Sequence, residues 1–169
     1  MKAVLLAAAA LIAAPLSAQT VAITGGTVAL GDGSQPIPNG TVVFRDGRIV
    51  AAGAGVAVPA GATVVDARGK WVSPGIVTGP NDLGLLDADG VDESNDLSAR
   101  TSPFNASIDV ATSINPDSTA IANERLGGVT RAIVAPGAAG SIFAGQGAVV
   151  DLGADPDPVT RARAFQYVE

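Results

Sequence analysis

The residue types that could do chemistry in this chain are limited to carboxylates, lysine, tyrosine and hydroxyls. The 169-residue sequence contains no histidine and no cysteine, and it has a single tyrosine. These absences exclude disulfides, thiolate zinc sites, cysteine nucleophiles, Ser-His-Asp triads and histidine-ligated zinc within the chain. Any chemistry must therefore use carboxylate, amine or hydroxyl groups, or a metal ion that is bound through oxygen atoms.

Carboxylates are concentrated between residues 82 and 96, where the acidic positions are Asp82, Asp87, Asp89, Asp92, Glu93 and Asp96. Residues 87 and 89 begin the ligand spacing of an EF-hand calcium loop. Val91 then stands at the third ligand position, Asp92 replaces the required glycine, and Ser98 replaces the final glutamate. These departures favour a solvated acidic loop over a specific calcium site.

The overall composition narrows the class of partner and of fold. The formal net charge is −6, which argues against nucleic acid as a partner because phosphate binding needs clustered Lys and Arg. The 21 glycines and 11 prolines favour many turns between short strands over a helical bundle. The sequence carries no feature that specifies an oligomeric state.

The first 18 residues have the pattern of a signal peptide. Lys2 precedes an uninterrupted apolar run over residues 3–14, Pro15 ends the run, and Ala18 is followed by a predicted cleavage before Gln19. The run is shorter than the roughly 20 apolar residues that a membrane-spanning helix needs. We therefore expect an exported protein, periplasmic or secreted, with no membrane span after cleavage. An uncleaved anchor or a buried helix is the alternative.

Residues 19–73 are predicted to form a small antiparallel β-sandwich or half-barrel of about six short strands. The strongest local signal is Asp46-Gly47 between two β-branched runs, which is typical of a two-residue hairpin turn. The hairpin is expected to bury Val43 and Ile49 on one face. Further turns are expected at residues 31–33 and 59–61.

Two stretches resemble the amidohydrolase superfamily at the point where a small β-domain leads into a metal-hydrolase barrel. They are DGRIVAAG at residues 46–53 and VDARGKWVSPGI at residues 65–76. Downstream, INP at 114–116, RLGGVTR at 125–131, VAPG at 134–137 and GQGAVV at 145–150 resemble the imidazolonepropionase-like branch, whose members are often exported. The resemblance implies hydrolysis of non-peptide C–N bonds by a hydroxide bound to a divalent metal.

The metal-binding part of the family pattern is missing. Aligned from Pro74-Gly75, the two histidines of the family's His-x-His motif fall on Pro80 and Asp82, and an aspartate of the family falls on Thr78. Proline has no ligand atom, whereas the Asp82 carboxylate could still donate an oxygen to a hard metal. We therefore expect no cofactor in this chain and no zinc-dependent activity from it alone.

Residues 74–169 are expected to hold only the first two or three βα units of an incomplete (β/α)8 barrel, which needs about 200 to 250 residues. The overall fold class is thus mixed α/β, and the chain is interpreted as the N-terminal part of a longer protein. Predicted strands cover residues 76–78, 129–135 and 148–152. Predicted helices cover residues 108–114, 119–126 and 157–168.

The candidate ligand contacts follow from where barrels of this class bind their substrates, at the carboxyl ends of the strands. A strand over residues 129–135 would place Gly137 on that face, and Gln146 is expected nearby. The hypotheses are an exported amidohydrolase-like protein acting on a small molecule, a catalytically silent binding protein of the same fold, and a secreted β-rich interaction module.

Overall fold

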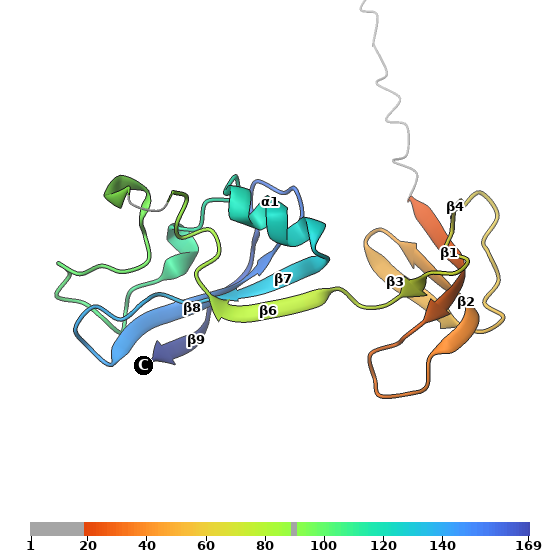
Figure 1. Cartoon of the computed structure of the whole chain (residues 1–169), viewed down its shortest axis with the longest axis horizontal. Helices are drawn as coiled ribbons and strands as arrows, with labels where there is room; N and C mark the ends of the chain where they lie inside the picture. Colours follow the sequence, from red (N-terminus) through yellow and green to blue (C-terminus); the bar gives the residue numbers. More distant parts are fainter. Residues whose placement is uncertain (1–18, 89–90) are drawn as a thin grey trace, which may run out of the picture. The chain divides into compact units, whose positions relative to one another are not determined.

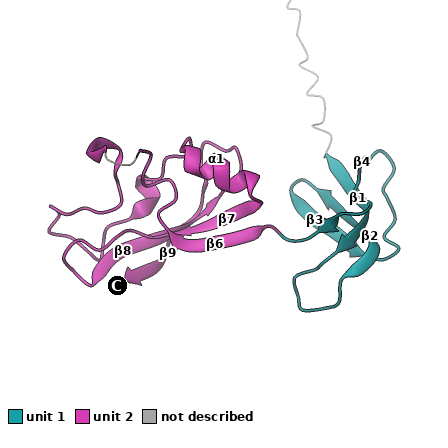
Figure 2. Ribbon diagram, in the orientation of Figure 1, with its two compact units in different colours: residues 1–74 teal, residues 75–169 magenta. Residues whose placement is uncertain are grey.

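The computed structural model describes residues 19–88 and 91–169, which belong to two compact units, residues 1–74 and residues 75–169 (Figure 2). The predicted signal peptide, residues 1–18, lies outside the described residues, as does Asp89 of the acidic loop. Within the part that is described, no helix is long and apolar enough to cross a membrane.

The first unit is a five-stranded mixed sheet. Its strands are β1 (Thr20–Val28), β2 (Ile37–Arg45), β3 (Arg48–Gly53), β4 (Thr63–Asp66) and β5 (Trp71–Val72). The order is β3-β2-β1-β4, and β5 pairs with β1 beyond the end of β4 (Figure 1). The predicted all-antiparallel arrangement is wrong, because β4 and β5 both run parallel to β1.

The predicted hairpin is confirmed between β2 and β3. Asp46 and Gly47 have φ angles of 51° and 71°, the left-handed values that a type I′ turn needs at both central positions. Val43 is buried, as expected, but Ile49 is 71% exposed. The prediction failed for Ile49 because β3 is the outer strand of the sheet, and a register shift between Val43 and Phe44 interrupts its pairing with β2.

The second unit is a four-stranded sheet with one α-helix. Its strands are β6 (Ile76–Asn81), β7 (Val129–Val134), β8 (Phe143–Asp151) and β9 (Val159–Val168), in the order β6-β7-β8-β9. The helix α1 (Thr119–Leu126) connects β6 to β7, which run parallel, while β7, β8 and β9 pair antiparallel. Two short 3-10 helices, η1 (Asp92–Ser94) and η2 (Val110–Thr112), lie between β6 and α1.

The core of this unit forms where α1 lies over β7 (Figure 1). Ile121 is the buried residue of the helix, and it packs in one cluster with aliphatic side chains of β7 and β8. The cluster consists of Leu83, Leu85, Val110, Ile121, Val129, Ala132, Val134, Ala148, Val150 and Leu152. Removing such side chains from water is the main source of stability for the unit.

Two predicted helices of this unit are wrong, whereas the helix over residues 119–126 and the strand that begins at Val129 are confirmed. Residues 108–114 contain only the single turn of η2. Residues 159–168 form the strand β9, whose Phe165 pairs with Gly147 of β8. Gly147 has no side chain, so the aromatic ring covers its backbone, and this cross-strand contact favours the strand.

The predicted barrel beginning is therefore only partly realised. The described residues contain one strand–helix–strand crossover of the kind a (β/α)8 barrel repeats, from β6 through α1 to β7. The chain then continues as the antiparallel strands β8 and β9, and no barrel is formed by residues 19–88 and 91–169. The fold of the described chain is mostly β, with one short α-helix.

Candidate functional site

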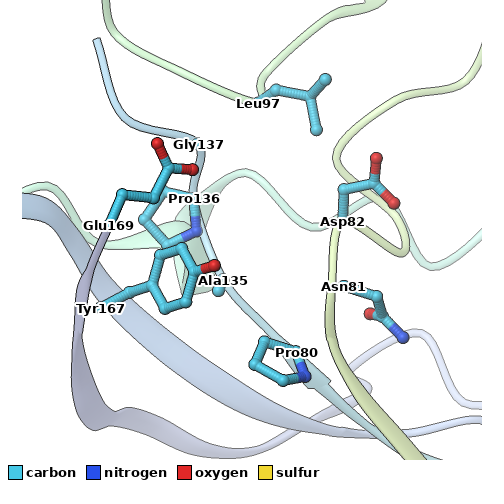
Figure 3. Close-up of a pocket in the computed structure, with 9 residues that line it drawn as sticks. All are labelled: Pro80, Asn81, Asp82, Leu97, Ala135, Pro136, Gly137, Tyr167 and Glu169. Carbon is cyan, nitrogen blue, oxygen red and sulfur yellow. The ribbon is translucent and has the colours of Figure 1, made fainter. Parts of the chain in front are cut away.

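Three strands of the second unit end at the same edge of the sheet and line a pocket there. β6 and β7 are parallel, and β9 runs in the same direction because two antiparallel pairings separate it from β7. The pocket has a volume of about 380 Å³ (Figure 3). Its lining residues are Pro80, Asn81, Asp82, Leu97, Ala135, Pro136, Gly137, Tyr167 and Glu169.

Backbone hydrogen bonds position the walls of the pocket. The Ala135 amide donates to the carbonyl oxygen of Asn81 at 2.8 Å, which ties the end of β7 to the end of β6. The Gly137 amide donates to the Leu97 carbonyl at 2.7 Å, which ties the segment after β7 to the segment that carries Leu97. The Glu169 amide donates to the Ile142 carbonyl at 3.0 Å. Each wall is therefore fixed by a contact between residues that are distant in sequence.

Gly79 precedes the lining residue Pro80 and lies where β6 comes close to β7. Its φ is 127°, and a Cβ atom at this position would collide with the Ile133 carbonyl oxygen. The pairing of β6 with β7 is irregular between Thr78 and Asn81. The glycine thus permits the local path of β6 that brings Pro80 and Asp82 to the pocket wall.

The polar groups of the pocket are few and mostly acidic. Asp82 and Glu169 lie on opposite walls, with the Asp82 carboxylate turned away from Glu169, and the Tyr167 ring lies between Glu169 and Pro80 (Figure 3). Neither carboxylate takes part in any of the ion pairs found among residues 19–88 and 91–169. No Lys or Arg belongs to the lining. The pocket is therefore a negatively charged site with an aromatic and proline-rich wall.

The structure brings together three of the four residues that the sequence singled out. Pro80, Asp82 and Gly137 all line the pocket. Gln146 does not, because it lies within β8, where its amide donates to the Ile108 carbonyl at 2.7 Å and the residue pairs with Gln166. These placements describe geometry and leave the roles of the residues as hypotheses.

Sequence reasoning missed Tyr167 and Glu169, because residues 157–168 were predicted as a helix. A signal for the strand was present. Residues 161–164 alternate between polar and apolar side chains, and the alternation resumes over residues 165–167 after one shift, a period-2 pattern that is typical of a strand. Reading that alternation as β9 would have carried the chain to the same sheet edge as β6 and β7.

The donor set does not fit a tetrahedral zinc ion. Pro80 offers no ligand atom, and Asp82 is the single acidic residue at the two positions that match the family's histidines. Within residues 19–88 and 91–169, no group of three or more His, Cys, Asp or Glu side chains is arranged to hold a metal. Zinc that activates water generally has three protein ligands, so the residues present do not supply this chemistry.

Two carboxylates outside the pocket have pKa values that are lowered by a neighbouring arginine. The Arg163 side chain, 2.7 Å from Asp109 Oδ2, lowers the pKa of Asp109, and the Ala111 amide that donates to Oδ1 acts in the same direction. In the first unit, hydrogen bonds from Arg68 lower the pKa of Asp66 to about 2. Both are pairings with arginine that fix local structure, and neither belongs to the pocket lining.

The chain is similar in fold to part of a protein of known structure. No protein-family model matches the chain, and no curated protein matches it. Among solved structures, the amidohydrolase from Thermotoga maritima MSB8 superposes with a TM-score of 0.77 and 24% identity, over 88% of this chain and 38% of that protein. The chain thus shares its fold with part of an amidohydrolase and spans well under half of that protein's length.

Two further structures match over a smaller part. Molinate hydrolase and phenylurea hydrolase B are each 42% identical to this chain over 41% of its length and 15% of theirs, with TM-scores of 0.36 and 0.37.

Proposed function

We propose that this chain is an amidohydrolase-like protein whose pocket binds a small molecule without a metal-activated water. Hydrolysis of non-peptide C–N bonds, which the sequence resemblance implies for the family, is not expected from residues 1–169 alone. The observation that carries the proposal is the pocket itself. It lies at the carboxyl ends of β6 and β7, yet the positions that match the family's histidines are Pro80 and Asp82.

Water must be activated before it can act as a nucleophile at neutral pH. A zinc-bound water reaches a pKa of about 7, compared with 15.7 in bulk water, and this supplies hydroxide at neutral pH. The pocket offers Asp82, Glu169 and Tyr167, which can bind and orient a ligand through hydrogen bonds and charge. None of these groups lowers the pKa of water to that extent. The arrangement therefore supports binding better than hydrolysis.

Metal analysis of the purified chain, combined with turnover assays on cyclic amides and amino-acid amides, tests the proposal. We expect less than one zinc ion per chain after dialysis. We also expect that a chelator abolishes no turnover, because the unaltered chain has no zinc-dependent activity. The double variant Pro80→His, Asp82→His restores the family's ligand types at both positions and is a positive control for metal uptake. Stoichiometric zinc in the unaltered chain, together with activity that chelation abolishes, would refute the proposal.

A second candidate function is favoured by the coverage of the Thermotoga maritima amidohydrolase, of which the chain spans 38%. These residues would then be one part of an active hydrolase, and further ligands would come from residues outside 1–169. The same assays on a longer product of the same reading frame separate the two candidates. Bound metal and chelation-sensitive turnover in the longer protein favour the active hydrolase, and their absence favours the binding protein.

We also propose that the protein is exported to the periplasm or the medium after cleavage between Ala18 and Gln19. The support is the 12-residue apolar run over residues 3–14, followed by a small residue at position 18. N-terminal sequencing of protein from the exported fraction is expected to begin at Gln19. Protein that remains in the cytosol with Met1 at its terminus would contradict this proposal.

A further inference from the structure

We infer that Gln19, the first residue of the proposed exported chain, is a modification site that cyclises to pyroglutamate, so that the mature protein has no free N-terminal amine. The inference rests on the proposed cleavage between Ala18 and Gln19, and it goes beyond the binding function proposed for the pocket. It concerns the other end of the chain and the first residue that the structure describes.

The reaction uses only atoms of residue 19 and releases ammonia. The uncharged α-amine attacks the side-chain amide carbon Cδ, the N–Cδ bond forms, and the Cδ–Nε2 bond breaks. The amine gives up one proton and Nε2 leaves as ammonia, so no oxidant, reductant or second substrate is consumed. Both reacting groups belong to one residue and close a five-membered lactam ring, so the reaction avoids the entropic cost of bringing two molecules together.

Signal-peptide cleavage creates the nucleophile for this reaction. In the uncleaved chain the nitrogen of Gln19 is a peptide amide that is bonded to Ala18, and an amide nitrogen does not attack a carboxamide. After cleavage the same nitrogen is an α-amine, whose ordinary pKa is about 8, so a fraction of it is uncharged and nucleophilic at neutral pH. Cyclisation is therefore expected in the exported protein and not in its precursor.

The structure leaves Gln19 able to close the ring without disturbing the first sheet. Gln19 is exposed and lies outside regular secondary structure, and β1 begins at the next residue, Thr20. Thr20 pairs with Arg45 of β2, and Arg45 Nε donates to Thr20 Oγ1 at 3.1 Å. The reacting atoms of Gln19 lie on the far side of its carbonyl group from Thr20, so ring closure leaves this pairing intact.

The lactam protects the strand on which the first sheet is assembled. β1 pairs with β2, β4 and β5, and its first residues Thr20 and Val21 are paired already. An aminopeptidase requires a free N-terminal amine, and a free Gln19 would offer one directly before this strand. Cyclisation removes both that amine and its positive charge, so the mature chain is closed to trimming from its N-terminus.

Mass spectrometry of the exported protein tests the inference. Free amines are acetylated on the intact protein before digestion, so a Gln19 amine that is still free becomes acetylated and cannot cyclise during handling. Digestion after arginine then releases residues 19–45, which contain no Lys and no Arg before Arg45. We expect this peptide to be unacetylated and lighter by one ammonia, with the loss located at its first residue by the fragment ions.

Gln19→Asn is the matched control. Asparagine keeps a terminal amide but is one methylene shorter, so the corresponding ring would be a strained four-membered lactam and the amine should stay free and be acetylated. Two residues of the same peptide serve as internal controls for the position of the loss. Gln35 has no free amine and should keep its ammonia, whereas Asn39, which precedes Gly40, can lose ammonia by forming an imide and must be distinguished by the fragment ions. An aminopeptidase should release asparagine from the variant and no glutamine from the unaltered protein.

The outcomes separate the inference from the proposed cleavage. If residues 19–45 are recovered acetylated with an intact Gln19, and remain so after prolonged incubation at neutral pH, the inference is wrong and the cleavage stands. If the N-terminal peptide of the exported protein begins at a residue other than Gln19, the cleavage site is wrong and the inference fails with it. A cyclised peptide 19–45 from the unaltered protein, with an acetylated one from Gln19→Asn, supports both.

Discussion

Glycine is required at one position in each unit, Gly47 and Gly79, for different reasons. Gly47 sits in the β2–β3 turn with φ 71°, and a side chain added there would meet nothing within 4 Å. Gly79 has φ 127° in β6, and a side chain there would collide with the backbone of β7. The first requirement is local and conformational, whereas the second is also a packing requirement between residues distant in sequence. The wall of the pocket formed by β6 depends on the packing requirement at Gly79.

The largest expected effect comes from Gly79→Ala. The backbone strain of a non-glycine residue and the collision with the Ile133 carbonyl together should destabilise the second unit by at least about 2 kcal/mol. Urea unfolding followed at Tyr167, which lies in this unit, measures the loss. The same variant should broaden or shift the Tyr167 signals in the folded protein, since β6 forms one wall of the pocket.

Gly140→Ala is the matched control for this prediction. Gly140 also has a positive φ, 84°, but an added Cβ would meet nothing within 4 Å. Its substitution carries the conformational cost without the collision, so its effect should be clearly smaller than that of Gly79→Ala. Equal effects of the two variants would show that the close approach of β6 to β7 is not a constraint.

The second prediction concerns the hairpin of the first unit. Gly47→Val should destabilise this unit by about 1 kcal/mol or more, because a β-branched residue is costly at positive φ. Gly47→Asn should have a smaller effect, since asparagine tolerates the left-handed conformation. Trp71, the single tryptophan, lies in this unit and reports its unfolding by fluorescence. An unchanged unfolding midpoint for Gly47→Val would contradict the turn assignment.

The same difference between local and long-range requirements determines which elements could be predicted from the sequence. The turn at Asp46-Gly47, the helix at residues 119–126 and the strand from Val129 were predicted because each is specified by its own residues. β9 was missed because its alternation of polar and apolar residues is interrupted at Ala164 and Phe165, so its pairing with β8 decides between helix and strand. Pairing across the sheet is a tertiary effect that local propensity does not contain.

The residues of the candidate site fall into two groups, those that the sequence predicted and those that depend on the pairing of a distant strand. Pro80 and Asp82 were reached by aligning motifs, and Gly137 by following a predicted strand to its carboxyl end. All three line the pocket because they lie at or just beyond the ends of the parallel strands β6 and β7. Tyr167 and Glu169 depend on the course of β9, so the error over residues 157–168 removed them from the sequence-based prediction. Because one strand was predicted as a helix, the predicted site lacked its aromatic residue and its second carboxylate.

The third prediction tests a half-buried ion pair of the second unit. Asp109 is 15% exposed at its side chain, accepts from the Ala111 amide at 3.0 Å, and pairs with Arg163. Asp109→Asn removes the charge and can keep the hydrogen bond from the Ala111 amide, so it should cost about 0.5–1 kcal/mol. Asp109→Ala also removes that hydrogen bond, which caps η2, and should cost about 1–2 kcal/mol. Unfolding at pH 7 followed at Tyr167 measures both.

The pH dependence of this variant has a defined sign. The pKa of folded Asp109 lies below its usual value of 3.8, so the pair stabilises the folded state fully above that pH. The contribution is lost as the pH falls from 3.8 through the lower pKa of the folded state. The difference in stability between the unaltered chain and Asp109→Asn should therefore shrink at pH 3. A difference that grows on acidification would contradict the pairing.

The smallest expected effect is at Asp66 in the first unit, although its pKa is lowered further, to about 2. The Asp66 and Arg68 side chains are 54% and 81% exposed, and solvent screening leaves exposed pairs with little effect on stability. Arg68→Gln should raise the pKa of Asp66 part of the way to 3.8, because the backbone amide at position 68 still donates to Oδ1 at 3.0 Å. We expect this rise in a carboxyl NMR titration without a measurable change in the unfolding midpoint at Trp71. A clear loss of stability in Arg68→Gln would show that this exposed pair supports the sheet as the half-buried pair at Asp109 does.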